Sequence, residues 1–246
     1  MFEDIDRFRY EHKYVEPEIN LIGMEARLAA LLKKDDHVGD RGFYSIRSLY
    51  FDDYSDRSLY ENISGVDERT KWRIRIYDQN DRFISLERKI RKSDMVAKQS
   101  CPINKMTFEE IMAGTIGIEP GNPQLLNLFV REIKTRALHP AVIVEYERTP
   151  FVCAEGNTRV TIDRNIRSSS ELGAFLENRS LISRPVLLSG QNLLEVKYDM
   201  FLPDQIAHAV EHGRMRRETF SKYYLARRFS YNGTVRYGFA AGRERI

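Results

Sequence analysis

The stretch from Glu68 to Lys98 decides the fold, and it reads ERTKWRIRIYDQNDRFISLERKIRKSDMVAK. In its first half, apolar side chains alternate with charged or polar ones: Trp72, Ile74 and Ile76 against Lys71, Arg73, Arg75 and Tyr77. Successive side chains of a β-strand point to opposite faces of the sheet. The alternation therefore predicts a strand with one apolar face and one cationic face.

The second half repeats the pattern after a short turn. Ile84 and Leu86 alternate with Ser85, Glu87 and Lys89, and residues 78–81 read Asp-Gln-Asn-Asp, which is typical of a turn. The two halves predict a hairpin whose polar face carries fixed positive charge and one carboxylate. In a single hairpin such a face is usually solvated surface.

The same alternation recurs in other parts of the chain, which favours a shared polar interior. We expect further strands over residues 8–14, 43–51, 96–103, 141–148, 159–163 and 193–197. If this sheet closes into a barrel, the cationic faces converge on one channel. Arg159 and Asp163 share a polar face and are predicted to form an ion pair in its wall.

Helices are predicted between and after these strands, which makes the fold class α+β. Their expected ranges are 17–32, 107–113, 124–135, a segment starting near 203, and 220–229. Thr107 and Glu110 have the spacing of a capping box. Residues 168–190 read as a long connection whose structure the sequence leaves unassigned, and no repeat or linker divides residues 1–246, so we expect a single domain.

Composition excludes several classes of protein. Of 246 residues, 42% are hydrophobic and 30% are charged, so disorder is not expected. The net charge is only +3, so any polyanion site must arise from local placement of charge. Without a signal peptide or a membrane-spanning apolar run, and with two cysteines lacking ligand spacing, the sequence predicts a cytoplasmic protein with reduced thiols.

Eight short motifs along the chain resemble one known family. They are Glu11-x-Lys13, Ser48-Leu49-Tyr50-Phe51-Asp52, Arg73-x-Arg75, Leu86-Glu87-Arg88-Lys89, Lys98-x-Ser100, Tyr146-x-Arg148, Leu194-Glu195-Val196-Lys197 and Phe220-Ser221-Lys222-Tyr223. Each motif is weak alone, but their order and spacing resemble the triphosphate tunnel metalloenzymes and, more closely, the VTC (vacuolar transporter chaperone) domain of polyphosphate polymerases. The resemblance covers about Arg9 to Arg228.

The resemblance implies an antiparallel, eight-stranded tunnel barrel with flanking helices. Its bore would hold a phosphate chain and a divalent cation, Mn²⁺ or Mg²⁺, with Glu195 and Glu11 as metal ligands. Substrate would be bound by a set of cations of which Arg73, Arg75, Lys89 and Lys222 are also expected to be catalytic. The full substrate-binding set is Lys13, Arg73, Arg75, Lys89, Lys98, Arg148 and Lys222.

The residue types suit phosphoryl transfer, in which catalysis is mainly positioning and electrostatic stabilisation. Arginine grips two phosphate oxygens with a planar fork, whereas lysine is a compact, mobile charge. Two arginines two residues apart on a strand, such as Arg73 and Arg75, lie about 7 Å apart and can hold successive phosphates. A few carboxylates plus substrate phosphates are the usual ligands of Mg²⁺.

Four functions remain open from the sequence. The first is an ATP-dependent polyphosphate polymerase, with ATP and polyphosphate as partners; the second is a triphosphatase acting on tripolyphosphate, a nucleoside triphosphate or an RNA 5′ end. Arg9 stands where the wider superfamily has the first glutamate of a Glu-x-Glu-x-Lys motif, which favours the polymerase. The third is a non-catalytic polyphosphate-binding module. Nucleic-acid binding is disfavoured by the small net charge, no membrane span is expected, and a homo-oligomer is neither indicated nor excluded.

Overall fold

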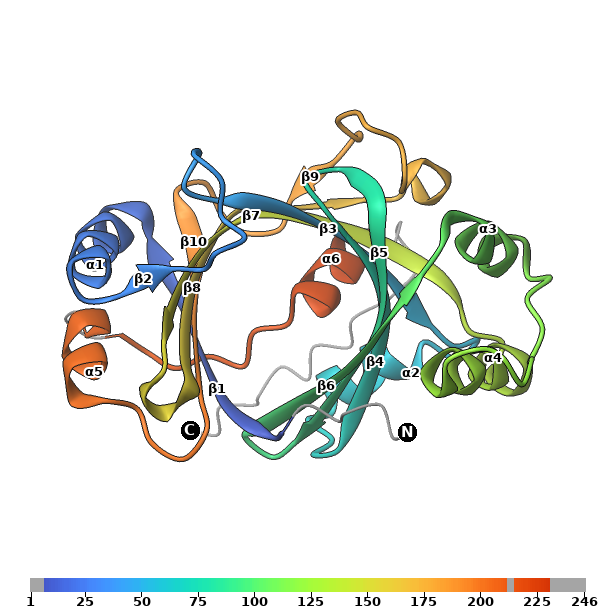
Figure 1. Ribbon diagram of the computed structural model, residues 1–246, viewed down its shortest axis with the longest axis horizontal. Coiled ribbons are helices and arrows are strands. Elements are labelled where there is room, and N and C mark those ends of the chain that lie inside the picture. The colour runs from blue at the N-terminus through green and yellow to red at the C-terminus, as the bar shows by residue number, and fades with distance from the viewer. Residues whose placement is uncertain (1–6, 212–214, 231–246) are drawn as a thin grey trace, which may run out of the picture.

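An antiparallel β-barrel forms the centre of the protein. The computed structural model describes residues 7–211 and 215–230. Eight strands pair in the order β7-β3-β4-β5-β6-β1-β10-β8, and β8 pairs again with β7, so the sheet closes on itself. Figure 1 looks into the resulting ring. The strands are β1 (Arg9–Pro17), β3 (Tyr44–Asp52), β4 (Arg69–Tyr77), β5 (Asn80–Lys92), β6 (Met95–Ile103), β7 (His139–Cys153), β8 (Thr158–Ser169) and β10 (Gln191–Tyr198). Two short strands, β2 (Lys33–Lys34) and β9 (Arg184–Pro185), pair with β7 and β8 outside the ring.

The predicted hairpin is the β4–β5 pair, and its two faces separate as expected. Trp72 and Ile74 face outward into an apolar core, while Arg73 and Arg75 face the interior. In the register, Arg73 lies opposite Glu87 and Lys71 lies opposite Lys89. Because each strand of the barrel alternates in this way, the polar rows of distant segments meet inside the ring.

Helices cover the barrel on two sides (Figure 1). On one side, α3 (Lys105–Ala113) and α4 (Gln124–Arg136) bury the outer faces of β3 to β6, with Phe129 in edge contact with Phe51. On the other side, α1 (Glu18–Leu31) and α5 (Asp204–Val210) cover β8 and β10. These two apolar cores lie outside the ring, whereas a third, which includes Ile46, Val144 and Tyr223, packs inward-facing side chains of β3 and β7 against a C-terminal helix and leaves the rest of the interior for polar groups.

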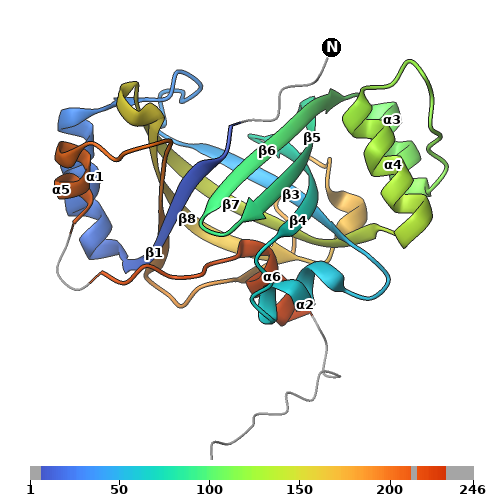
Figure 2. The same ribbon diagram turned by 90° about the horizontal axis from the view of Figure 1, so that it is seen from below.

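A helix from the C-terminal part of the chain enters the ring. Helix α6 (Lys222–Ser230) lies within the outline of the barrel in Figure 1, and Figure 2 shows it beside α2 (Arg57–Ile63) at one end. Tyr223 is buried in α6 and donates a hydrogen bond to Asp52 at the end of β3. Asp52 also accepts hydrogen bonds from the backbone N–H groups of Ser58 (2.8 Å) and Leu59 (3.2 Å) in α2. One buried carboxylate thus fixes both helices at this end of the barrel.

One sequence prediction about local structure is wrong. Helix α3 begins at Lys105, and its N-cap is Asn104, whose side chain accepts a hydrogen bond from the Thr107 N–H, so Thr107 does not cap the helix. The sequence left residues 168–190 unassigned, and part of this connection has regular structure. It includes the end of β8, a 3₁₀ turn over Leu172–Ala174, and β9.

The buried side chain of Arg47 explains the order of that connection. It points outward from β3 and donates hydrogen bonds to the carbonyl oxygens of Phe175 (3.0 Å), Glu177 (2.6 Å) and Arg179 (2.7 Å). Separately, no helix in the part of the chain that the structure describes is both long enough and apolar enough to span a bilayer.

Candidate active site

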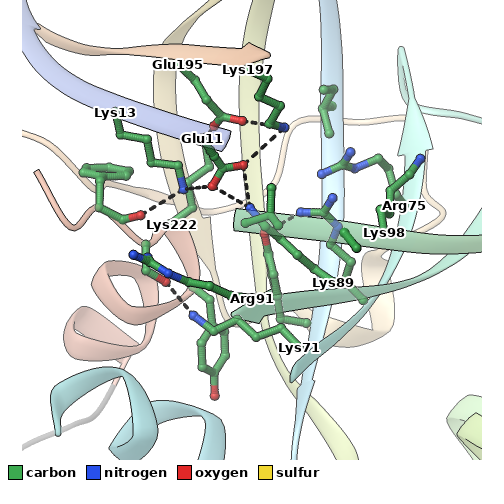
Figure 3. Close-up of a pocket in the computed structure, with 18 of the residues that line it drawn as sticks. Glu11, Lys13, Lys71, Arg75, Lys89, Arg91, Lys98, Glu195, Lys197 and Lys222 are labelled. Carbon is green, nitrogen blue, oxygen red and sulfur yellow. Dashed lines mark hydrogen bonds and ion pairs between the residues drawn. The ribbon is translucent and has the colours of Figure 1, made fainter. Parts of the chain in front are cut away.

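The interior of the barrel is a tunnel lined mostly by cations. Fourteen of the described lining residues are arginine or lysine, and two, Glu11 and Glu195, are acidic. Figure 3 shows these side chains converging from separate strands and from α6. All nine residues of the predicted site line this one space: Glu11, Lys13, Arg73, Arg75, Lys89, Lys98, Arg148, Glu195 and Lys222.

The central part of the tunnel is organised by Glu87, a buried carboxylate on β5. Its Oε2 atom accepts a hydrogen bond from Arg73 Nε (2.7 Å) and forms ion pairs with Arg73 Nη2 (2.6 Å) and Arg75 Nη1 (3.6 Å). Burial by itself raises the pKa of Glu87, but Arg73 and Arg75 hold the pKa far below its usual range. Glu87 is therefore a fixed anion that orients two arginines.

Hydroxyl groups from two further strands also hold these two arginines in place. Arg73 Nη1 donates to the Tyr50 hydroxyl (3.1 Å), and Arg75 donates to Ser48 Oγ (3.1 Å) and to the Tyr146 hydroxyl (3.3 Å). Each guanidinium is therefore held by several strands at once. Such fixed donors need little reorganisation when an anion binds.

A second group surrounds the two lining carboxylates. Both oxygens of Glu11 accept hydrogen bonds from Lys89 Nζ at 2.8 Å, and Glu11 also lies 2.8 Å from Lys13 Nζ. Lys197 Nζ lies between the two carboxylates and forms ion pairs with Glu11 (3.3 Å) and Glu195 (2.7 Å). Burial raises the pKa of both carboxyl groups, but the surrounding lysines hold each pKa well below its usual range.

A third group holds the cation that α6 supplies. Lys222 Nζ lies 2.6 Å from Asp163 on β8, and Arg148 donates to both oxygens of the same carboxylate at 2.6 and 2.7 Å. Burial raises the pKa of Asp163, but Arg148 and Lys222 lower it below its usual range. Lys222, which by helix position alone reads as a surface lysine, is buried in the tunnel.

The predicted ion pair between Arg159 and Asp163 is wrong. Asp163 pairs with Arg148 and Lys222 instead, and Arg159 pairs with Asp35 at 2.7 Å. The cause is the fold itself, because the antiparallel β7–β8 register places Arg148 directly opposite Asp163.

Sequence reasoning did not assign site roles to several tunnel cations. Lys71, Lys197, Arg69 and Arg91 also line the tunnel. The signal was available in the period of two, because Arg69 and Lys71 share the inward row of Arg73, and Lys197 shares that of Glu195.

Glu11 and Glu195 are the groups that could hold a divalent cation. Among residues 7–211 and 215–230, no three His, Cys, Asp or Glu side chains converge as a complete metal site. Mg²⁺ is commonly held by one or two carboxylates together with substrate phosphates. Two ionised carboxylates that share a lysine fit that arrangement, with the remaining ligands left to phosphate and water.

The fold is a closed tunnel barrel whose bore is lined mostly by cations. The model of the VTC domain family matches residues 8–231. The chain therefore belongs to the VTC domain family. A comparison with curated proteins finds no match.

Several solved structures are similar to this chain at low sequence identity, and the first of those below shares its fold. A putative adenylyl cyclase from Hippeastrum, described as having a dominant triphosphatase activity, is 13% identical with a TM-score of 0.51, over 90% of this chain and 95% of that one. A putative adenylate cyclase from Bacillus halodurans is 11% identical with a TM-score of 0.48, over 82% and 84%. The Mimivirus capping enzyme triphosphatase is 11% identical with a TM-score of 0.35, over 85% and 88%.

Proposed function

We propose that this protein is a metal-dependent polyphosphate polymerase that transfers the terminal phosphoryl group of ATP to a polyphosphate chain. The observation that carries the proposal is the closed tunnel in which fixed cations surround two ionised carboxylates. A polyanion and a divalent cation together complement that charge arrangement. Membership of the VTC domain family supports a substrate of this class.

In the proposed reaction, an oxygen of the terminal phosphate of the growing chain attacks the γ-phosphorus of ATP. The bond from that phosphorus to the β–γ bridging oxygen breaks, and ADP leaves with the electron pair. No protein nucleophile is required. When bound at Glu11 and Glu195, Mn²⁺ or Mg²⁺ would neutralise phosphate charge and ease departure of the leaving oxygen.

The side chains of the tunnel would position the reacting phosphates. Arg73 and Arg75, fixed by Glu87, would grip phosphate oxygens as planar forks. Lys222, held by Asp163, and Lys89, held by Glu11, would add compact charge near the carboxylates. These cations would stabilise the charge that spreads over the equatorial oxygens in the transition state.

Lys13, Lys98 and Arg148 would extend this binding surface along the substrate. Lys13 lies beside Glu11, Lys98 lies 3.8 Å from Glu87, and Arg148 is fixed by Asp163. We assign these three to substrate binding rather than to the chemical step.

A triphosphatase is the second candidate. The Hippeastrum protein of the same fold, with its described triphosphatase activity, favours it. In that reaction water replaces the phosphate oxygen as the attacking group. Arg9 argues for the polymerase, because its side chain pairs with Asp199 at 3.1 Å and adds no carboxylate to β1 at that position.

Product analysis tests the proposal. The protein is incubated with ATP or with tripolyphosphate, in Mn²⁺ or Mg²⁺, and the phosphate products are separated by chain length. Long polyphosphate from ATP is the expected result. If orthophosphate is the only product, the protein is a triphosphatase and not a polymerase. If the protein binds these ligands but turns over neither of them in either metal, it is a binding module.

A matched pair of variants tests the role of Glu195. Glu195→Gln keeps the shape of the side chain but removes its charge, so turnover should fall by about 100-fold or more while tripolyphosphate still binds. Glu109→Gln, on the exposed face of α3, is the control and should keep full turnover. Equal turnover in Glu195→Gln would contradict the assigned role.

A further inference from the structure

The inward row of β4 carries four cations that differ in how they are neutralised. Arg69, Lys71, Arg73 and Arg75 follow one another at every second residue, about 7 Å per step along the strand. Arg73 and Arg75 share Glu87. Among the described residues, neither Arg69 nor Lys71 has a carboxylate oxygen within 4.0 Å.

Neutral groups take the place of the carboxylate at this end of the row. Lys71 Nζ donates to Ser221 Oγ (2.8 Å) and to Asn62 Oδ1 (3.2 Å), and Arg69 Nη1 lies 3.5 Å from the same Asn62 oxygen. Asn62 belongs to α2 and Ser221 directly precedes α6, so these contacts lie at the end of the barrel where the two helices meet (Figure 2). In Figure 3, Lys71 and Arg91 lie on the side of the pocket away from Glu195.

The strand register adds more positive charge at the same place. Arg69 lies directly opposite Arg91 on β5, and Lys71 lies directly opposite Lys89. Like charges in directly opposed positions of a sheet are destabilising. The carboxylate nearest to Arg91 is that of Asp94, at 4.0 Å and largely exposed. Among the described residues, Arg69 and Lys71 have no carboxylate oxygen within 4.0 Å, so their charge is available for an anion from outside.

We infer that Arg69, Lys71 and Arg91, with Asn62 and Ser221, form a second phosphate subsite, which binds the part of a polyphosphate chain that extends beyond the Arg73–Arg75 subsite. The arginine forks and the ammonium bind phosphate oxygens, and the Asn62 amide and Ser221 hydroxyl can add neutral donors. The inference rests on the proposed function and sharpens it. A triphosphate is held at the Arg73–Arg75 subsite, whereas only a longer chain reaches Lys71.

The protonation of Lys71 gives this subsite a measurable signature. Burial and the nearby charges of Lys13 and Arg69 lower the pKa of Lys71 to about 7. A bound phosphate would raise that pKa again, so Lys71 would take up a proton at pH 8 but not at pH 6. The charged and titratable groups that face Lys71 from its neighbours are Lys13 on β1, Asp52 on β3, Arg69 on β4, Arg91 on β5 and Tyr223 on α6.

The opposing lysine, Lys89, must be separated from Lys71 in this measurement. Burial also lowers the pKa of Lys89. Its ammonium bonds both oxygens of Glu11 at 2.8 Å, so its setting differs from that of Lys71, and the proton uptake that belongs to Lys71 is the part that a Lys71→Arg variant removes.

Calorimetry with the whole protein tests the inference. Tripolyphosphate and a polyphosphate several times longer are titrated at pH 8 and at pH 6, each in two buffers with different heats of ionisation, which gives affinity and proton uptake together. The longer chain should bind more tightly and take up as much as one proton at pH 8. In Lys71→Met and in Arg69→Met, the affinity gained with the longer chain should fall by roughly tenfold, while tripolyphosphate affinity stays the same.

A charge-conserving variant and a surface control complete the test. Lys71→Arg should keep the long-chain affinity but lose the proton uptake, which alone decides the matter if Lys71→Met is poorly folded. Lys33→Met, on the exposed strand β2, should behave as the wild type. Equal losses for both ligands, or no loss for either, would overturn the second subsite. Failure of the wild type to bind either ligand would instead contradict the proposed function.

Discussion

The two halves of the β4 cation row meet the same problem, buried positive charge, in different ways. Arg73 and Arg75 share the carboxylate of Glu87, so their positions are fixed before any ligand arrives. Arg69 and Lys71 donate only to neutral acceptors among the described residues, so no carboxylate within 4.0 Å balances their charge. The paired half holds its arginines in fixed positions for a bound phosphate, and the unpaired half attracts an anionic ligand by its positive charge.

The largest expected effect comes from breaking the paired half. Arg73→Met leaves Glu87 buried with its weaker partners only, Arg75 at 3.6 Å and Lys98 at 3.8 Å. The free energy of unfolding should fall by about 3 kcal/mol. Lys71→Met removes an unbalanced charge and should not destabilise the protein. Urea unfolding of the two variants measures the contrast, and equal losses would show that the halves do not differ.

Removing the carboxylate from the paired half should have an intermediate effect on stability. Glu87→Gln leaves Arg73 and Arg75 without their anion, so the ligand-free protein should lose about 2 kcal/mol of stability. Tripolyphosphate should then restore more stability than it adds to the wild type, because it replaces the missing negative charge. Thermal unfolding with and without tripolyphosphate measures this difference. The same ligand-induced shift in both proteins would argue against Glu87 as the balancing charge.

The smallest expected effect is the pH dependence that Lys71 introduces. Its pKa of about 7 in the folded protein lies below that of an unfolded lysine, about 10.4. Between these values the unfolded chain binds more protons, so the contribution of Lys71 to stability rises with pH.

The destabilisation by charged Lys71 is therefore full below pH 7 and fades toward pH 10. Lys71→Met should be more stable than the wild type at pH 6 by less than about 1 kcal/mol, because tunnel water screens this partly buried group. The advantage should shrink at pH 9. Unfolding curves at both pH values check this, and a constant difference would mean that Lys71 keeps its proton throughout.

The sequence predicted the barrel and its inward face because both follow from a period of two. Arg73, Lys89 and Glu195 lie where that alternation places them, and the family motifs ordered the strands. Which anion holds which cation was not predictable. The partnership of Asp163 with Lys222 depends on α6 entering the ring, and no local pattern in the sequence encodes that step.

The start of α3 was predicted wrongly for a similar reason. Asn104 and Thr107 are both residue types that cap helices, and α3 buries Phe108 and Ile111 with its first turn starting at Lys105. In residues 168–190, the order comes from Arg47, which lies more than a hundred residues earlier. Long-range contacts therefore decide what the local sequence leaves ambiguous.

The late position of Lys222 in the chain has a consequence for biosynthesis. Most tunnel cations lie on strands that leave the ribosome before β10 and α6. The pairing of β10 with β1 and β8 closes the ring, and α6 brings Lys222 to Asp163. An emerging chain therefore displays arginines and lysines on an open sheet, where cellular polyanions can reach them. Closure by β10 and α6 withdraws these side chains into the bore, so completion of folding is also the step that ends indiscriminate contact with anions.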